Sequence, residues 1–200
     1  MAGEKSSLMK IGIGDALTVV DVRNDFLPGG SLAVPGGDEI TEGLNHYVAA
    51  FSIRSLPVFA TRDWHPLRHC SFREQGGPWP SRCVAGTVDA AFAPGLRLPA
   101  SVPVVSRDTT VEKDAYSGFA GTDLDAQLHA ASGRRVFVGG LATDYCVLNT
   151  VNADLAKGFE TFLLEDAVRA VDVSDGDGAR ALAQMRARGT WPVTREVIDA

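Results

Sequence analysis

The sequence predicts an α/β fold with a mainly parallel sheet of six strands and helices on both faces of the sheet. Short β-branched apolar segments alternate along the chain with segments of helical periodicity. Two of the strand candidates, residues 17–20 and 136–138, are apolar almost without interruption, as expected for strands covered on both faces. The 200 residues are enough to bury a complete core, so we expect one domain in a three-layer, Rossmann-like arrangement.

The expected strands are short and rich in Val, Thr and Phe, and they cover residues 16–21, 57–61, 102–106, 135–138, 161–165 and 191–195. The expected helices cover residues 38–53, 123–131, 143–157 and 178–187. In the first helix, five apolar side chains recur at helical spacing and predict a buried stripe: Ile40, Leu44, Tyr47, Val48 and Phe51.

Two segments fall outside this alternation. Residues 1–14 lack the apolar core and cleavage site of a secretory signal, and we predict a flexible leader before a domain of residues 15–200. Residues 62–99 are rich in Pro, Gly, Arg and aromatic side chains and show little periodicity. A long irregular loop inside a compact domain is usually functional, so we expect this loop to take part in the site.

Bulk properties exclude several classes of protein. The net charge of -6 and the pI near 5.2 argue against a nucleic-acid partner, and no apolar run approaches the length of a membrane span. No phosphate-binding glycine motif follows a strand, so no nucleotide cofactor is expected. Three cysteines without a closely spaced pair fit reduced thiols and a cytoplasmic location.

Ligands of open α/β sheets bind beyond the carboxyl ends of the strands, and this rule selects a set of polar residues. Asp21 ends the first predicted strand, Asp63 and His65 follow the second, Lys113 lies beyond the third, and Cys146 opens the helix after the fourth. Taken alone, Cys146 is more simply a small buried side chain and Asp21 a loop cap. Taken together at matching strand ends, the residues favour a catalytic site.

The position of Cys146 suits a nucleophile. Thr143 is a plausible N-cap, which places Cys146 in the first helical turn, where unpaired N–H groups favour a thiolate and can bind an oxyanion. A free thiol is only a few per cent ionised at neutral pH, so nearby groups such as Asp21 and Lys113 would have to assist it.

Other residues give weaker signals. Asp63 and His65 are spaced so that both can face one ion in an extended segment, and His69 is a further candidate ligand, although an exposed loop histidine is the simpler interpretation. Phe26, Trp79 and Tyr116 are aromatic residues for which core packing is the simpler interpretation when each is taken alone.

Five ordered blocks resemble those of a known family, the nicotinamidases among the isochorismatase-like cysteine hydrolases. The blocks are Asp21-Val22-Arg23-Asn24-Asp25-Phe26-Leu27-Pro28-Gly29-Gly30, Ala60-Thr61-Arg62-Asp63-Trp64-His65-Pro66, Gly76-Gly77-Pro78-Trp79-Pro80, Lys113-Asp114-Ala115-Tyr116-Ser117-Gly118-Phe119 and Ala142-Thr143-Asp144-Tyr145-Cys146-Val147. The similarity runs from Leu17 nearly to the C-terminus. It implies hydrolysis of nicotinamide to nicotinate and ammonia through a cysteine thioester, within NAD salvage.

The resemblance also implies roles for single residues. Asp21, Lys113 and Cys146 would form the catalytic triad, and backbone N–H groups of Ala142 and Cys146 would form the oxyanion hole, with a cis peptide before Ala142. The residues expected around the pyridine ring are Phe26, Trp79 and Tyr116.

The resemblance also implies a divalent metal, expected to be zinc, that is bound through an Asp-x-His pair and a third histidine. Asp63 and His65 would be the pair, but the third position holds Arg82, which has no lone pair to offer. Three interpretations stay open: His69 completes the site, metal binding is weakened, or Arg82 itself contacts the substrate. The first block also carries Arg23 where glutamine is usual.

Two other functions are compatible with these residues. One is hydrolysis of another small amide or carbamoyl compound, with Arg82 binding a substrate carboxylate. The other is a catalytically idle relative retained for binding, which the complete triad argues against. The partner expected in each case is a small molecule, and a homo-oligomer is compatible with the sequence.

Overall fold

The computed structural model describes residues 9–199, and its centre is a six-stranded sheet in which every neighbouring pair is parallel. The order is β4-β3-β2-β5-β6-β7. The strands are β2 (Asp15–Val20), β3 (Val58–Asp63), β4 (Val104–Arg107), β5 (Arg135–Leu141), β6 (Glu160–Arg169) and β7 (Trp191–Val193). The predicted fold class and number of strands in this sheet are confirmed.

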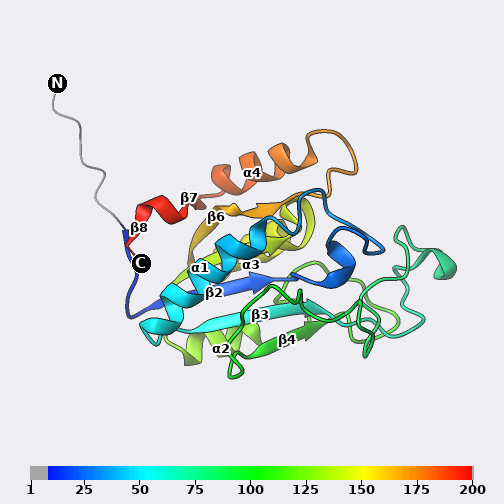
Figure 1. The fold of residues 1–200 in the computed structure, drawn as a ribbon, viewed down its shortest axis with the longest axis horizontal. Helices are drawn as coiled ribbons and strands as arrows, with labels where there is room; N and C mark the ends of the chain where they lie inside the picture. The colour runs from blue at the N-terminus through cyan, green and yellow to red at the C-terminus, as the bar shows by residue number, and fades with distance from the viewer. Residues whose placement is uncertain (1–8, 200) are drawn as a thin grey trace.

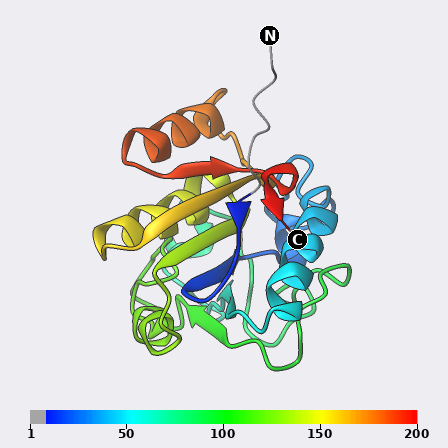
Figure 2. The same ribbon diagram turned by 90° about the vertical axis from the view of Figure 1, so that its left-hand side faces the viewer.

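Helices cover both faces of the sheet (Figure 2). One face carries α1 (Ile40–Ile53), and the other carries α2 (Leu124–Ala130), α3 (Leu148–Ala156) and α4 (Asp177–Ala187). The predicted stripe of α1 is fully buried against the sheet, and Leu44 and Phe51 belong to the same core cluster as Leu17 of β2. A second cluster on the opposite face joins Val138 to Leu128 of α2 and Val151 of α3. None of the helices in residues 9–199 has the length and apolarity needed to cross a membrane.

Glycine at position 140 allows β5 to lie close to β2. Gly140 pairs with Val20, its φ is +133°, and a Cβ atom there would overlap the carbonyl oxygen of Val20. Only glycine combines this backbone conformation with such a close approach. The chain beyond β5 therefore emerges directly beside the end of β2.

Some boundaries differ from those predicted. The helix expected over residues 143–157 begins with a wide π-type turn (Thr143–Val147) before α3, and Ala142 rather than Thr143 is its N-cap residue. Within the segment predicted as a flexible leader, β1 (Met9–Lys10) pairs in parallel with β8 (Ile198–Asp199). The first eight residues of that prediction lie outside the described residues. Within residues 9–199, short 3₁₀ turns occur at Asn24–Phe26, Arg73–Gln75 and Arg195–Val197.

The long loop between β3 and β4 is fixed to the segment that follows β2. The backbone N–H of Cys83 donates to Asp25 Oδ2 at 2.5 Å, while Asp25 Oδ1 accepts from Ser31 Oγ at 2.8 Å. The buried guanidinium of Arg23 lies 4.7 Å from the ring centre of Phe92, which adds a cation–π contact. In Figure 1 the arrows of β2, β3 and β4 point toward this loop, so the loop lies at the carboxyl edge of the sheet.

Candidate active site

Four neighbouring parallel strands bring polar side chains together at their carboxyl ends. Asp21 directly follows β2, Asp63 and Arg107 are the last residues of β3 and β4, and Cys146 lies in the turn after β5. All four residues are buried. The site therefore lies where the strand-end rule places ligands in open α/β sheets.

The guanidinium of Arg107 connects the nucleophile candidate to a carboxylate. Its Nη2 lies 2.5 Å from Asp21 Oδ2 and donates to Cys146 Sγ at 2.8 Å. The hydroxyl of Thr61 donates to the other oxygen of Asp21 at 3.1 Å. The thiol of Cys146 and the carboxylate of Asp21 thus both contact the same buried cation.

The same guanidinium contacts two further carboxylates. Its Nη2 also forms an ion pair with Asp63 Oδ1, and its Nη1 donates to Asp108 Oδ2 at 2.6 Å. The second donor of Nη1 goes to the carbonyl oxygen of Ala115. Desolvation lowers the pKa of Arg107, but the carboxylates of Asp21, Asp63 and Asp108 outweigh it and raise that pKa well above its ordinary value. Arg107 therefore carries its charge at neutral pH.

The thiol of Cys146 is held in its neutral form. Burial is the largest cause and raises the pKa of Cys146 well above its ordinary value, the charges of Asp21 and Asp63 raise it further, and Arg107 opposes them. A side-chain hydrogen bond to Asp21 also favours the protonated thiol. Attack by Cys146 consequently needs a base that removes the proton, and Asp21 is in hydrogen-bond contact.

The turn around Cys146 agrees with two of the predictions. Cys146 lies in the first turn after β5, and the peptide bond between Leu141 and Ala142 is cis, as expected. The carbonyl oxygen of Ala142 accepts from the backbone N–H groups of Tyr145 and Val147 at 3.1 and 3.0 Å. An oxyanion hole formed by Ala142 and Cys146 stays a prediction.

A small, mostly apolar pocket opens onto Cys146. Its walls are aromatic, aliphatic and charged side chains from several loops: Phe26, Leu32, Asp63, Trp79, Arg82, Tyr116, Ala142, Tyr145, Cys146 and Val171. Trp79 Nε1 donates to the Tyr116 hydroxyl at 2.9 Å, and the Tyr145 ring lies 5.1 Å from that of Trp79. A larger groove at the amino ends of β3 and β4 contains no titratable side chain among its lining residues, so we place the chemistry in the small pocket.

Comparison with known proteins decides the family. The isochorismatase domain matches residues 15–197. The nicotinamidase of Escherichia coli is 34% identical over 195 residues, which cover 87% of this chain and 92% of that protein. The chain belongs to the isochorismatase family of hydrolases.

Two solved structures resemble this family member closely. The pyrazinamidase of Pyrococcus horikoshii in complex with zinc is 45% identical, with a TM-score of 0.87 and coverage of 90% of this chain and 99% of that chain. PnC1 of L. infantum in complex with nicotinate is 34% identical, with a TM-score of 0.88 and coverage of 96% and 98%.

In this isochorismatase-family hydrolase, the cation beside Asp21 and Cys146 is not the one expected from the sequence. Lys113 is exposed on the loop after β4, and its ammonium makes no hydrogen bond or ion pair within residues 9–199. Arg107 occupies the position between the carboxylate and the thiol instead. The physical reason is that Arg107 is the last residue of β4, whereas the side chain of Lys113 is exposed on the loop that follows and its backbone oxygen contacts His69.

Asp63 and His65 lie close together, and His65 has a ring nitrogen that can bind a metal. His65 Nδ1 donates to the carbonyl oxygen of Arg82 at 3.0 Å, so Nε2 keeps its lone pair. That Nε2 atom is buried, has no hydrogen-bond partner among the described residues, and lies 4.0 Å from Asp63 Oδ2. Burial is the main cause that lowers the pKa of His65 to about 3, so the ring is neutral. Asp63 and His65 therefore fit a divalent ion.

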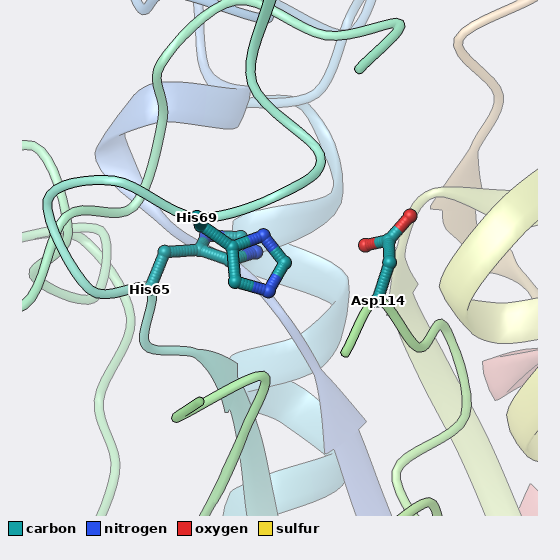
Figure 3. Close-up of side chains that lie close together, drawn as sticks. All are labelled: His65, His69 and Asp114. Atoms are coloured by element: carbon teal, nitrogen blue, oxygen red, sulfur yellow. The ribbon is translucent and has the colours of Figure 1, made fainter. Parts of the chain in front are cut away.

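His69 does not offer a comparable nitrogen. Because a carbonyl oxygen only accepts, His69 Nε2 must donate to Lys113 O at 2.6 Å, and Nδ1 then accepts from Ser71 Oγ at 2.8 Å. The rings of His65 and His69 lie 4.4 Å apart, and Figure 3 shows Asp114 across a gap from them. His69 would have to break a hydrogen bond before it could bind a metal.

Arg82 lines the pocket at the expected third-ligand position. Its side chain is buried, with Nη1 3.3 Å from Ser71 Oγ and Nε 3.9 Å from Asp63 Oδ2. The guanidinium lies 5.6 Å from the Trp79 ring centre, and Nη2 has no hydrogen-bond partner among residues 9–199. A permanently protonated group cannot ligate a metal, so this position does not fit the expected third ligand.

Sequence reasoning missed Arg107, which contacts three carboxylates in the site, and Asp108, which is one of those carboxylates. Both directly follow the predicted strand of residues 102–106, so the strand-end rule, applied to the nearest residues, would have selected them.

Proposed function

We propose that this chain hydrolyses nicotinamide, or a close heteroaromatic amide such as pyrazinamide, to the carboxylate and ammonia. The observation that carries the proposal is the shared contact of Arg107 with Asp21 and Cys146 at the end of an aromatic pocket. The similarity to a nicotinamidase and to a structure with bound nicotinate supports this choice of substrate.

In the first half of the reaction, Asp21 takes the proton of the Cys146 thiol while the sulfur attacks the carboxamide carbon. The tetrahedral intermediate collapses when its C–N bond breaks, and Asp21 passes the proton to the leaving nitrogen, which departs as ammonia. In the second half, Asp21 activates a water molecule that attacks the thioester. The products are the free carboxylate and the restored thiol.

Arg107 acts by holding charges rather than by transferring a proton. Its guanidinium stays protonated, fixes the position of Asp21, and stabilises the sulfur as it loses its proton. This is the role that the family resemblance assigns to a lysine.

The substrate would bind with its ring between the aromatic walls of Phe26, Trp79 and Tyr116. The backbone N–H groups of Ala142 and Cys146 would stabilise the developing oxyanion. The unpartnered Nη2 of Arg82 is a donor suited to the ring nitrogen or to another acceptor on the substrate.

A divalent metal, with zinc the first choice because a similar pyrazinamidase contains it, would be held by Asp63 and His65. When bound, it would act as a Lewis acid that orients an acceptor atom of the substrate.

The experiment is a measurement of ammonia release from nicotinamide, pyrazinamide and carbamoyl compounds by the wild type, Cys146→Ala and Cys70→Ala. We expect turnover of the two heteroaromatic amides by the wild type and Cys70→Ala, and none by Cys146→Ala. Equal activity of Cys146→Ala and the wild type would exclude Cys146 as the nucleophile.

One observation favours a second candidate function. The free donor of Arg82 in the pocket is also suited to a substrate carboxylate, as in a small amide or carbamoyl compound with an acidic group. Faster turnover of such a compound than of nicotinamide would establish this alternative, and no turnover in the whole panel would indicate an idle relative.

We further propose that the reaction takes place in the cytoplasm and serves NAD salvage. The three cysteines are unpaired, which agrees with a reducing compartment.

A further inference from the structure

We propose that Asp108 is the third ligand of a divalent metal site whose other two ligands are Asp63 and His65. This site does not require the proposed reaction, because it is defined by its donor atoms alone. It takes a divalent transition ion such as Zn²⁺, Mn²⁺ or Co²⁺, for which two carboxylate oxygens and one imidazole nitrogen are a suitable ligand set.

The donor atoms of the three residues lie close together. One ligand atom from each of Asp63, His65 and Asp108 lies within 4.8 Å of the other two, and all three residues are buried. Ligands bound to one ion at about 2.0–2.2 Å lie somewhat closer together than this, so the three groups need only a small inward movement.

Two of these donor atoms lack hydrogen-bond partners among the described residues. His65 Nε2 and Asp108 Oδ1 are buried atoms without a hydrogen-bond partner among residues 9–199. Buried polar atoms without partners are costly, and an ion between them would satisfy both. The relative exposure of His65 is 0%, so bulk water does not solvate its lone pair.

Arg107 holds both carboxylates of the proposed site. It binds Asp63 through Oδ1 and Asp108 through Oδ2. Asp108 Oδ1 has no hydrogen-bond partner among the described residues, and Asp63 Oδ2 lies 4.0 Å from His65 Nε2 and 3.9 Å from Arg82 Nε. One guanidinium therefore fixes both carboxylates while it leaves one oxygen of each for an ion.

The backbone at Asp108 supports a specific role for this side chain. Its φ is +55°, a left-handed conformation that is uncommon outside glycine and occurs often at functional sites. The residue lies directly after β4, next to Asp63 at the end of the neighbouring strand β3.

Carboxylates and guanidinium groups balance one another around the site. The carboxylates belong to Asp21, Asp63 and Asp108, and the guanidinium groups that act on them belong to Arg23, Arg82 and Arg107. An ion would therefore be held by its ligand atoms rather than by a surplus of negative charge. The nearby guanidinium groups make the affinity lower than that of a site without them.

A second cluster, His65, His69 and Asp114, also brings its ligand atoms within 4.8 Å (Figure 3). Both nitrogens of His69 are already hydrogen-bonded, and Asp114 is exposed, so an ion there would replace existing contacts. The cluster with Asp108 requires no such replacement at His65 Nε2 or Asp108 Oδ1.

The test is titration of the metal-free protein with Co²⁺, followed by its visible absorption and by calorimetry. We expect one site per chain in the wild type and at least about 10-fold weaker binding in Asp108→Asn. The matched control Asp114→Asn should bind as the wild type does. No substrate is present, so the result is independent of any ammonia-release assay.

A second variant keeps the test informative if Asp108→Asn does not fold. Asp108→His supplies a nitrogen ligand in place of an oxygen, and we expect it to bind Co²⁺ with an altered absorption spectrum. The proposal is overturned if the wild type binds no Co²⁺ specifically, if Asp108→Asn binds as tightly as the wild type, or if Asp108→His leaves the spectrum unchanged. Loss of binding in Asp114→Asn would assign the ion to the cluster with His69.

Discussion

The Nη2 atom of Arg107 donates a hydrogen bond of 2.8 Å to the Sγ atom of Cys146. The contact lies inside the protein, where the side chain of Arg107 is 1% exposed, so solvent does little to screen it. A cation that cannot lose its proton therefore lies beside a thiol that is neutral at rest. This relationship gives the first two predictions.

Substitution of Lys113 and of Arg107, one at a time, identifies which of the two is the cation of the site. Lys113→Ala should leave kcat/KM unchanged, because the Lys113 ammonium contacts none of the reacting groups. Arg107→Lys should keep the charge beside Cys146 but lose the second arm that binds Asp108, which lowers the free energy of unfolding by about 1–3 kcal/mol. Ammonia release and urea denaturation measure both effects. A large loss of activity in Lys113→Ala would return that residue to the triad.

The neutral state of Cys146 can be measured directly. Because burial and two carboxylates raise its pKa, we expect no thiolate at Cys146 between about pH 6 and pH 9, where a free cysteine would titrate. The ultraviolet absorbance of thiolate, in the wild type minus Cys146→Ala, should stay flat over this range, since Cys70 and Cys83 cancel in the difference. A rise in the difference near neutral pH would mean that the thiolate forms without substrate.

Asp21 is predicted to be the base. Asp21→Asn keeps the shape of the side chain but removes its ability to accept the thiol proton at neutral pH, so kcat should fall by about 10²–10⁴-fold. The amide can still accept from Thr61 Oγ1, which lets the fold persist. Circular dichroism and a steady-state assay test this together. If the folded variant kept full activity, another group would have to transfer the proton.

Arg82→His should strengthen metal binding and make activity more sensitive to chelators. The change removes a cation 3.9 Å from Asp63 and supplies a nitrogen ligand at the position where the family resemblance expects one. Elemental analysis and rates before and after chelation, in the wild type and the variant, provide the comparison. A wild type that already holds one tightly bound metal and loses all activity when stripped would contradict the weakened site.

Gly140→Ala should destabilise the fold severely, by several kcal/mol, because the new Cβ would overlap the backbone of β2. Gly158→Ala is the matched control: its φ is also positive, at +86°, but nothing lies within 4 Å of the added atom. In the control, only the strained backbone conformation of alanine should lower the free energy of unfolding, by about 1–2 kcal/mol. Similar losses in the two variants, measured by thermal denaturation, would show that the overlap is relieved by a small shift.

The sheet and its helices were predictable because the spacing of apolar residues and the composition of each segment indicate which side chains are buried. The apolar residues 17–20 and 136–138 became the two central strands, and the stripe of α1 packs as its spacing indicated. The site was predictable where the chemical groups directly follow a strand, as at Asp21, the Asp63–His65 pair and Cys146. Arg107 was missed because two cations, Arg107 and Lys113, follow the same predicted strand, and the sequence alone does not say which of them is buried in the site.

The contacts of Arg82 could not be predicted from the sequence either. Its backbone oxygen fixes the tautomer of His65, while its side chain lines the pocket. A pattern of residue types distinguishes neither role, because both depend on the path of an irregular loop.

The tie between Asp25 and the backbone of Cys83 has a consequence for how this pocket can diverge. It fixes the position next to Arg82 through a main-chain N–H, which every residue except proline supplies, so the loop keeps its place when side chains along it change. The nucleophile and its base belong to other segments, at the ends of β5 and β2. Substitutions along the loop can therefore change which substrates the pocket binds without changing the nucleophile or the base. Related chains can thus differ in substrate although their reacting groups are the same.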